Sequence, residues 1–196
     1  MVLLGLSGGA LANYLKAKFP HSQISAIESD AKMLDVAINH FHFKKEQNSN
    51  VTICDEIEYA RTIRQQVELL IVDVPNQNPA SPLKFPAAEF LEIDMLERIR
   101  DCLSDRGMAV INCICRDRQR KAAYVRNCKK VFPEFIVMTC EDEDNVVLLL
   151  SKTNVRDGFM AAAKSIGNIM EQSDREKLYF MLSRMTWNAE SSVQRN

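Results

Sequence analysis

The sequence lacks any apolar run long enough to cross a membrane. Its longest run, at residues 146–150, is far shorter than the roughly 20 residues of a spanning helix. Residues 1–6 contain no basic segment of the kind that opens a secretory signal peptide. We therefore expect a cytoplasmic protein with no membrane partner.

Charge of one sign is not in excess either. The 196 residues carry 25 lysines and arginines against 26 aspartates and glutamates, a net charge of -1. No overall basic field draws the protein to nucleic acid, so we expect no nucleic-acid partner. The one basic stretch, residues 116–130, is interpreted as a solvated helix face because no aromatic side chains alternate with its charges; an acidic partner or RNA is the alternative.

Metal-binding motifs are missing as well. The six cysteines lie mostly in apolar stretches, which favours buried, reduced thiols. Cys113 and Cys115 form a close pair, but no second pair of cysteines or histidines at zinc spacing accompanies them. His21, His40 and His42 flank predicted helix ends and have no partner fixed by the sequence. We expect no metal site and no catalytic histidine.

What the sequence does contain is a regular alternation of short apolar runs and amphipathic segments. This order is typical of successive βα units around a mostly parallel sheet, and the length suits one such domain. The seven predicted strands cover residues 2–6, 23–28, 51–54, 68–73, 108–115, 135–140 and 146–151. The run at residues 69–72 fits a central strand covered on both faces.

Helices are predicted between most of these strands. They cover residues 8–19, 31–41, 56–65, 87–103 and 118–132. Residues 74–86 hold four prolines and are predicted to form neither helix nor strand. The short link at 141–145 predicts a hairpin, and hence an antiparallel last strand.

The C-terminal part is predicted to be helical and to belong to the same domain. We expect the sheet domain over residues 1–152, helices within residues 153–187 packed on it, and a polar tail over residues 188–196. The two helices, predicted at 156–170 and 174–185, have an apolar side. An exposed apolar side there would favour a homodimer.

A glycine-rich turn follows the first predicted strand. Gly5 and Gly8 allow a sharp turn and a close ligand approach at a helix N-terminus. Glu28 ends the second strand about 20 residues later, where a carboxylate accepts hydrogen bonds from ribose hydroxyls. The alternatives are a tight turn without a ligand and a solvated strand end.

Two further carboxylates follow the next strands. Asp55 comes just after the third strand, where its side chain can accept a hydrogen bond from an adenine amine, and Asp73 ends the fourth. The carboxyl ends of parallel strands meet at one edge, where open α/β sheets bind ligands. The alternative for Asp55 is that it caps the following helix. Together these strand ends favour a nucleoside site.

Motifs at these strand ends resemble the spermidine-synthase-like family of S-adenosylmethionine-dependent methyltransferases. They are LLGLSGGAL at 3–11, AIESDAKML at 26–34, DEIEY at 55–59, VDV at 72–74 and NCICRD at 112–117. The resemblance covers residues 2–151 and is strongest to the enzymes that methylate elongation factor 1-alpha. It implies a Rossmann-like α/β fold with seven strands in the order 3-2-1-4-5-7-6, the last antiparallel.

The resemblance implies an S-adenosylmethionine site without a metal. Its cofactor-binding residues would be Gly5, Ser7 and Gly8 around the methionine part, Glu28 and Ser29 at the ribose, Asp55 and Glu56 near adenine, and Asp73 beside the methyl donor. Asp73 and the carbonyls of Val74 and Pro75 would align the acceptor amine. The implied reaction is methylation of elongation factor 1-alpha on its N-terminal α-amino group or a lysine.

The sequence departs from the family at several points. Ser7 replaces the middle glycine of the turn, which predicts weaker cofactor binding, and Glu56 stands where the family usually has glycine. Residues 74–86 contain no carboxylate of the kind that polyamine enzymes use, which disfavours aminopropyl transfer. Relatives carry a segment before the first strand that covers the pocket, so a catalytically silent binding module is the alternative function.

Overall fold

The computed structural model describes residues 1–44, 48–140, 144–154 and 156–187. Its strands are β1 Val2–Leu4, β2 Ile24–Glu28, β3 Ser49–Ile53, β4 Val67–Val72, β5 Leu83–Phe85, β6 Leu103–Cys115, β7 Glu134–Thr139, β8 Asn145–Ser151 and β9 Met185–Trp187. Its helices are α1 Ala10–Lys18, α2 Ala31–Phe41, α3 Glu56–Thr62, the 3-10 helix η1 Ala88–Leu91, α4 Ile93–Cys102, α5 Arg118–Val131, α6 Arg156–Ile169 and α7 Gln172–Ser183.

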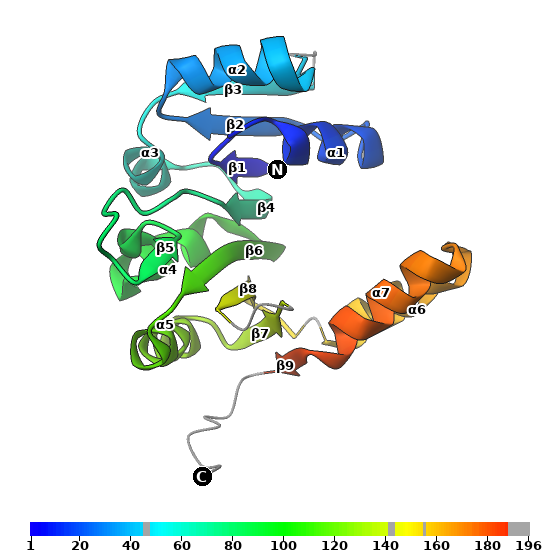
Figure 1. The fold of residues 1–196 in the computed structure, drawn as a ribbon. Coiled ribbons are helices and arrows are strands. Elements are labelled where there is room, and N and C mark those ends of the chain that lie inside the picture. The colour runs from blue at the N-terminus through cyan, green and yellow to red at the C-terminus, as the bar shows by residue number, and fades with distance from the viewer. Residues whose placement is uncertain (45–47, 141–143, 155, 188–196) are drawn as a thin grey trace.

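One sheet runs through the molecule in the order β3-β2-β1-β4-β6-β8-β7-β9 (Figure 1). The pairs among β1, β2, β3, β4 and β6 are parallel, whereas β8 is antiparallel to both β6 and β7. The predicted strand order and the antiparallel strand are therefore confirmed. The prediction of seven strands is wrong, because β5 and β9 add two short ones.

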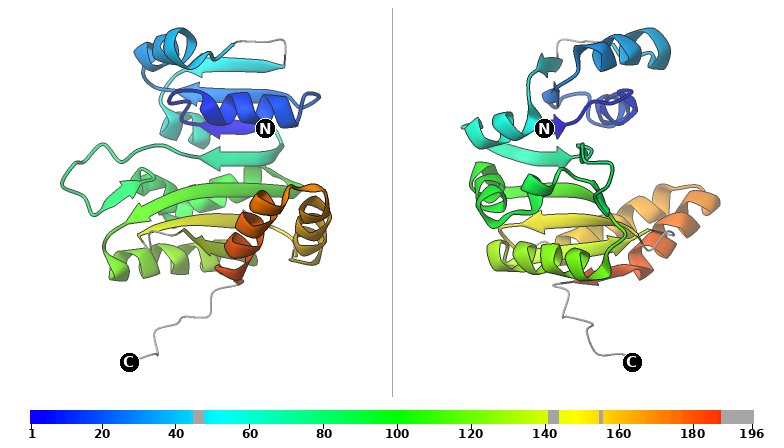
Figure 2. Two further views of the ribbon diagram at one scale, coloured as in Figure 1. Left: turned by 45° about the vertical axis from the view of Figure 1, so that its right-hand side comes forward. Right: turned by 60° about the vertical axis from the view of Figure 1, so that its left-hand side comes forward.

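Helices cover the two faces of this sheet unequally (Figure 2). On one face, α3, α4 and α5 enclose the larger apolar cluster, to which every one of β1, β2, β4, β6, β7 and β8 contributes. On the other face, α1 and α2 enclose a smaller cluster over β1 and β2. We name the first the closed face and the second the open face.

On the open face, the strands beyond β1 carry half-exposed apolar side chains. These are Leu69 and Ile71 of β4, Met108, Val110 and Ile114 of β6, and Val147 and Leu149 of β8. Paired residues of neighbouring strands project to the same side, and Ile71 pairs with Val110, which pairs with Leu149. The run in β4 was predicted to be covered on both faces. It is fully buried on the closed face and only partly buried on the open face.

The proline-rich segment predicted as a loop contains β5. Leu83 of β5 is completely buried and pairs with Cys115, and Phe85 pairs with Ile114. The last residue of β6 that pairs with β4 is Ile111, so the end of β6 extends beyond its neighbour. β5 supplies the missing partner there by an antiparallel addition.

The helix predicted over residues 87–103 is two helices. Glu92 separates η1 from α4 with an extended backbone, φ -81° and ψ 150°. The break lets Phe90 and Leu91 face the core together with Leu96, and all three are completely buried. β6 begins earlier than predicted, at Leu103 opposite Val67 of β4, and the register shifts before the next pair, Leu69 with Met108, as in a β-bulge.

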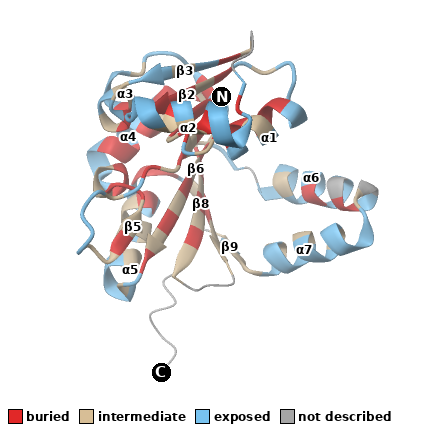
Figure 3. Cartoon of the chain, turned by 45° about the horizontal axis from the view of Figure 1, so that its top comes forward, coloured by how far each residue is buried: buried red, intermediate tan, exposed pale blue. Residues whose placement is uncertain are grey.

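The helices α6 and α7 form a hairpin that projects beside the sheet (Figure 1). It returns to the sheet through β9, which pairs with β7 at the sheet edge. Trp187 of β9 contacts Phe159 of α6 edge to face, with ring centroids 5.9 Å apart. No residue of α7 is buried among the described residues (Figure 3). The predicted polar tail lies outside the described residues.

Candidate functional site

The turn after β1 has an unusual backbone that explains its glycines. Gly5 has φ +89°, and a Cβ atom there would lie 2.5 Å from the carbonyl oxygen of Asp73. Gly5 is therefore required by the close approach of the chain after β4, whether or not a ligand binds. Ser7 also has a positive φ, 50°, a region that favours glycine over serine.

Glu28, at the end of β2, holds this turn in place. Its Oε2 accepts hydrogen bonds from the backbone N–H groups of Leu6 and Ser7, both at 3.1 Å, and its Oε1 accepts one from Asp30 N–H at 3.1 Å. The side chain is only 7% exposed. Glu28 is therefore not a solvated strand end. It is a buried acceptor that fixes the glycine-rich turn at the edge of the sheet.

Two acidic residues at the start of α3 have separate structural partners. Asp55 is the N-cap, and its Oδ1 accepts hydrogen bonds from Ile57 N–H at 2.8 Å and Glu58 N–H at 2.9 Å. The alternative interpretation, that Asp55 caps the following helix, is therefore confirmed for one of its two carboxylate oxygens. Glu56 is buried, and its Oε1 accepts a hydrogen bond from Ser29 N–H at 2.9 Å. This bond joins the end of β2 to the start of α3.

The electrostatics of this corner disfavour a charged Glu56. Burial is the main cause that raises the pKa of Glu56, and the negative charge of Glu28 adds to the rise. Hydrogen bonds from the backbone act in the opposite direction. The carboxyl group of Glu56 is therefore easier to protonate than that of an ordinary glutamate.

Asp73 follows β4 and has a partner that the sequence did not identify. Its Oδ1 accepts a hydrogen bond from the side-chain amide of Asn112 at 2.9 Å. Asn112 belongs to β6 and pairs with Val147, so it lies on the open face. It is a polar residue within an apolar strand, and that was the signal available in the sequence. The bond fixes the carboxylate beside the turn that contains Gly5.

The loop after Asp73 is ordered by its own backbone. The carbonyl of Val74 accepts a hydrogen bond from Ala87 N–H at 2.9 Å, and Asn76 N–H donates to the carbonyl of Lys84 at 2.8 Å. Val74 is buried, whereas Pro75 is exposed. Of the two carbonyls predicted to align an amine, that of Val74 therefore already has one donor.

The structure thus brings the predicted residues to one edge of the sheet. Gly5 N–H donates to the carbonyl of Ile27, and Asp73 N–H donates to that of Leu4, which binds the ends of β1, β2 and β4 together. The result is a rim with a glycine-rich turn and carboxylates on either side. Such a rim offers backbone donors and acidic acceptors to a polar ligand.

Two of the thiols, those of Cys113 and Cys128, are buried in the core. Burial raises the pKa of Cys113 and of Cys128 to about 12, which keeps both thiols neutral and unreactive. Among the described residues no group of three or more histidines, cysteines or carboxylates is placed to hold a metal ion. In the same part of the chain no helix is both long and apolar enough to cross a membrane.

Comparison with known proteins shows that the chain is similar to methyltransferases. No family model matches the chain. The chain is similar to the eEF1A lysine and N-terminal methyltransferase homolog of Drosophila pseudoobscura pseudoobscura, with 30% identity over 151 residues that cover 76% of this chain and 22% of the relative. The eEF1A lysine and N-terminal methyltransferase of Homo sapiens is 30% identical over 154 residues, with the same shares. The chain thus spans about a fifth of the length of these curated relatives.

Solved structures show the same likeness. The human methyltransferase-like protein 13 in complex with SAH has a TM-score of 0.75 and 25% identity, over 93% of this chain and 79% of that chain. A probable spermidine synthase from Corynebacterium glutamicum shares the fold, with a TM-score of 0.67 and 20% identity over 78% of this chain and 56% of that chain. The predicted resemblance and the Rossmann-like methyltransferase fold are confirmed.

Proposed function

We propose that this chain is an S-adenosylmethionine-dependent methyltransferase domain that methylates an amino group of a protein. The observation that carries the proposal is the buried Glu28, whose carboxylate orders the N–H groups of Leu6 and Ser7 at the carboxyl edge of the sheet. The similarity to named methyltransferases supports the same activity.

The residues at the rim suit this cofactor. Gly5, Ser7 and Gly8 would lie against its methionine part, and Glu28 with Ser29 would receive the ribose. Asp55 and Glu56 would lie near the adenine. When bound, S-adenosylmethionine supplies an activated methyl group on a sulfonium, so the protein needs mainly to orient the acceptor.

Orientation of the acceptor amine is assigned to Asp73. Asn112 holds one carboxylate oxygen of Asp73, which leaves the other oxygen able to accept a hydrogen bond from an amine. The carbonyls of Val74 and Pro75 would complete the amine site. Because the relatives are eEF1A lysine and N-terminal methyltransferases, elongation factor 1-alpha is the first substrate to test, at its N-terminal α-amino group or at a lysine. A cytoplasmic location remains a prediction.

Calorimetric titration with S-adenosylmethionine tests the cofactor site. Glu28→Gln is expected to weaken binding about tenfold or more, because a glutamine has one acceptor oxygen where Glu28 uses two, so its NH2 group would face a backbone N–H of the turn or of Asp30. Glu58→Gln, at an exposed position of α3, is the matched control and should bind as the unchanged chain does. Absence of binding by the unchanged chain would favour the alternative of a silent binding module.

A second variant separates binding from methyl transfer. Asp73→Asn should slow methylation of elongation factor 1-alpha about a hundredfold even at saturating S-adenosylmethionine, because the acceptor would be misplaced. Transfer of tritiated methyl groups to the intact factor and to its N-terminal peptide measures this rate. An unchanged rate would remove Asp73 from the site. Aminopropyl transfer to putrescine is not expected, since residues 74–86 contain no carboxylate.

A further inference from the structure

A cavity of about 190 Å³ lies between α3 and α4, away from the rim. It is lined by Ala60, Ile63, Arg64, Arg98, Asp101 and Cys102. Both helices run back from the carboxyl edge of the sheet and end near the first residues of β4 and β6. The cavity therefore lies at the edge opposite the glycine-rich turn and shares no residue with the proposed cofactor site.

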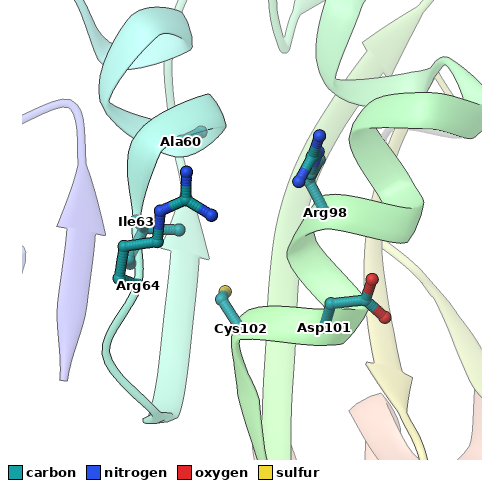
Figure 4. Close-up of a pocket in the computed structure, with 6 residues that line it drawn as sticks. All are labelled: Ala60, Ile63, Arg64, Arg98, Asp101 and Cys102. Carbon is teal, nitrogen blue, oxygen red and sulfur yellow. The ribbon is translucent and has the colours of Figure 1, made fainter.

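Two guanidinium groups from different elements line this cavity. Arg64 follows the C-cap of α3, and Arg98 belongs to α4. Figure 4 shows the two side chains on opposite sides of the gap between the helices. Within the described ranges, neither arginine has a carboxylate at ion-pair distance. Two unpaired cations that share one cavity repel each other unless an anion lies between them.

The other charges around the cavity do not cancel this excess. Asp101 is already engaged by Arg100, with Nη2 to Oδ1 at 3.0 Å. Burial raises the pKa of Cys102 to about 11, so its thiol is neutral at physiological pH. The C-terminal ends of α3 and α4 each contribute about half a negative charge, which offsets about one of the two cations. Because Arg100 balances Asp101, about one positive charge remains in this region.

We propose that this cavity binds a small oxyanion, of the phosphate or carboxylate class, through Arg64 and Arg98. Guanidinium groups bind such anions through two parallel N–H donors, and two of them enclose an anion from both sides. Ala60, Ile63 and Cys102 give the cavity an apolar wall beside the two guanidinium groups. The site is independent of the proposed methyltransferase function.

Titration of the chain with inorganic phosphate and with citrate, at constant ionic strength, tests the site. The arginine Nε–H signals in nitrogen-15 NMR spectra report binding at Arg64 and Arg98 directly. We expect a saturable shift of both signals. Saturation by phosphate alone assigns the phosphate class, and saturation by citrate alone assigns the carboxylate class. Shifts that rise linearly with either anion and never saturate would overturn the proposal.

Matched variants give the experiment its specificity. Arg64→Gln and Arg98→Gln should each weaken binding about tenfold or more, because a charged hydrogen-bond donor is lost. Arg61→Gln, exposed on α3 but outside the cavity, should leave binding unchanged. Asp101→Asn should tighten binding, because it removes a carboxylate and releases Arg100. Equal weakening by Arg61→Gln would overturn the proposal, since it would indicate unspecific attraction.

The variants also keep this proposal separate from the proposed function. The four substituted residues, Arg61, Arg64, Arg98 and Asp101, are all exposed, so the fold is expected to persist, and urea unfolding of each variant checks this. Calorimetry with S-adenosylmethionine should give the same affinity for Arg64→Gln as for the unchanged chain. Loss of anion binding with intact cofactor binding therefore locates the effect at the cavity.

Discussion

Neighbouring residues of one strand have different environments on the two faces of the sheet. Leu148 of β8 is 1% exposed and belongs to the large cluster of the closed face, whereas Leu149 is half-exposed on the open face. Ile111 and Val110 of β6 differ in the same way. The sequence is apolar at all four positions. Apolar composition therefore indicates a strand, but it does not indicate which face a helix covers.

The candidate site lies at the boundary between the helix-covered part of the open face and the part that no helix of the smaller cluster covers. Beside it, α1 and α2 cover β1 and β2, and beyond it the apolar side chains of β4, β6 and β8 are half-exposed. Asn112 projects to this face and reaches Asp73. The closed face instead provides the rigid packing that positions the strand ends. Three pairs of substitutions test this division.

The largest effect is expected for Leu148→Ala. Removal of a fully buried leucine leaves a cavity and should lower the free energy of unfolding by about 2 to 5 kcal/mol. Leu149→Ala removes the same atoms from the open face, where solvent fills the space, and should have about half that effect. Urea unfolding measures both. Equal losses would mean that the open face is packed as tightly as the closed one.

A smaller effect of opposite sign is expected for Ser7→Gly. Glycine relieves the positive φ of Ser7, which should stabilise the chain by about 0.5 to 1 kcal/mol and tighten cofactor binding. Ser29→Gly is the control, because Ser29 has no positive φ and glycine there should destabilise. If Ser7→Gly lowered stability, the strain assigned to this turn would be refuted.

The smallest effect is expected for Glu56→Gln, at the start of α3 on the closed face. The raised pKa of Glu56 means that the folded chain binds this proton more tightly than the unfolded chain does. Stability is then lost as pH rises from the ordinary glutamate pKa through the folded value. Glutamine retains the oxygen that accepts from Ser29 N–H, so the variant should be slightly more stable at neutral pH.

Unfolding free energies between about pH 4 and about pH 7 check this prediction. Glu56→Gln should show a smaller decrease across this range than the unchanged chain. The exposed Glu58→Gln serves as the control and should follow the unchanged chain. Identical pH profiles for all three would show that the burial of Glu56 has no electrostatic consequence.

The sequence by itself determined the order of elements and the edge that carries the site. Strand order was implied by resemblance, and Gly5, Glu28 and Asp73 were placed by the rule that parallel strands end at one edge. The placement of these three residues depends on local patterns and on the direction of the chain, whereas the strand order rests on the resemblance. They could therefore be predicted before any contact was known.

Only the tertiary structure decided which groups meet. The bonds of Glu28 to the turn and of Asn112 to Asp73 join residues 21 to 39 positions apart, and no periodicity encodes them. The strand β5 formed because the end of β6 extends past β4, and the helix broke at Glu92 because Phe90 and Leu91 are buried. The half-exposed face of β4, β6 and β8 likewise follows from where the helices pack, since burial depends on neighbours that are remote in sequence.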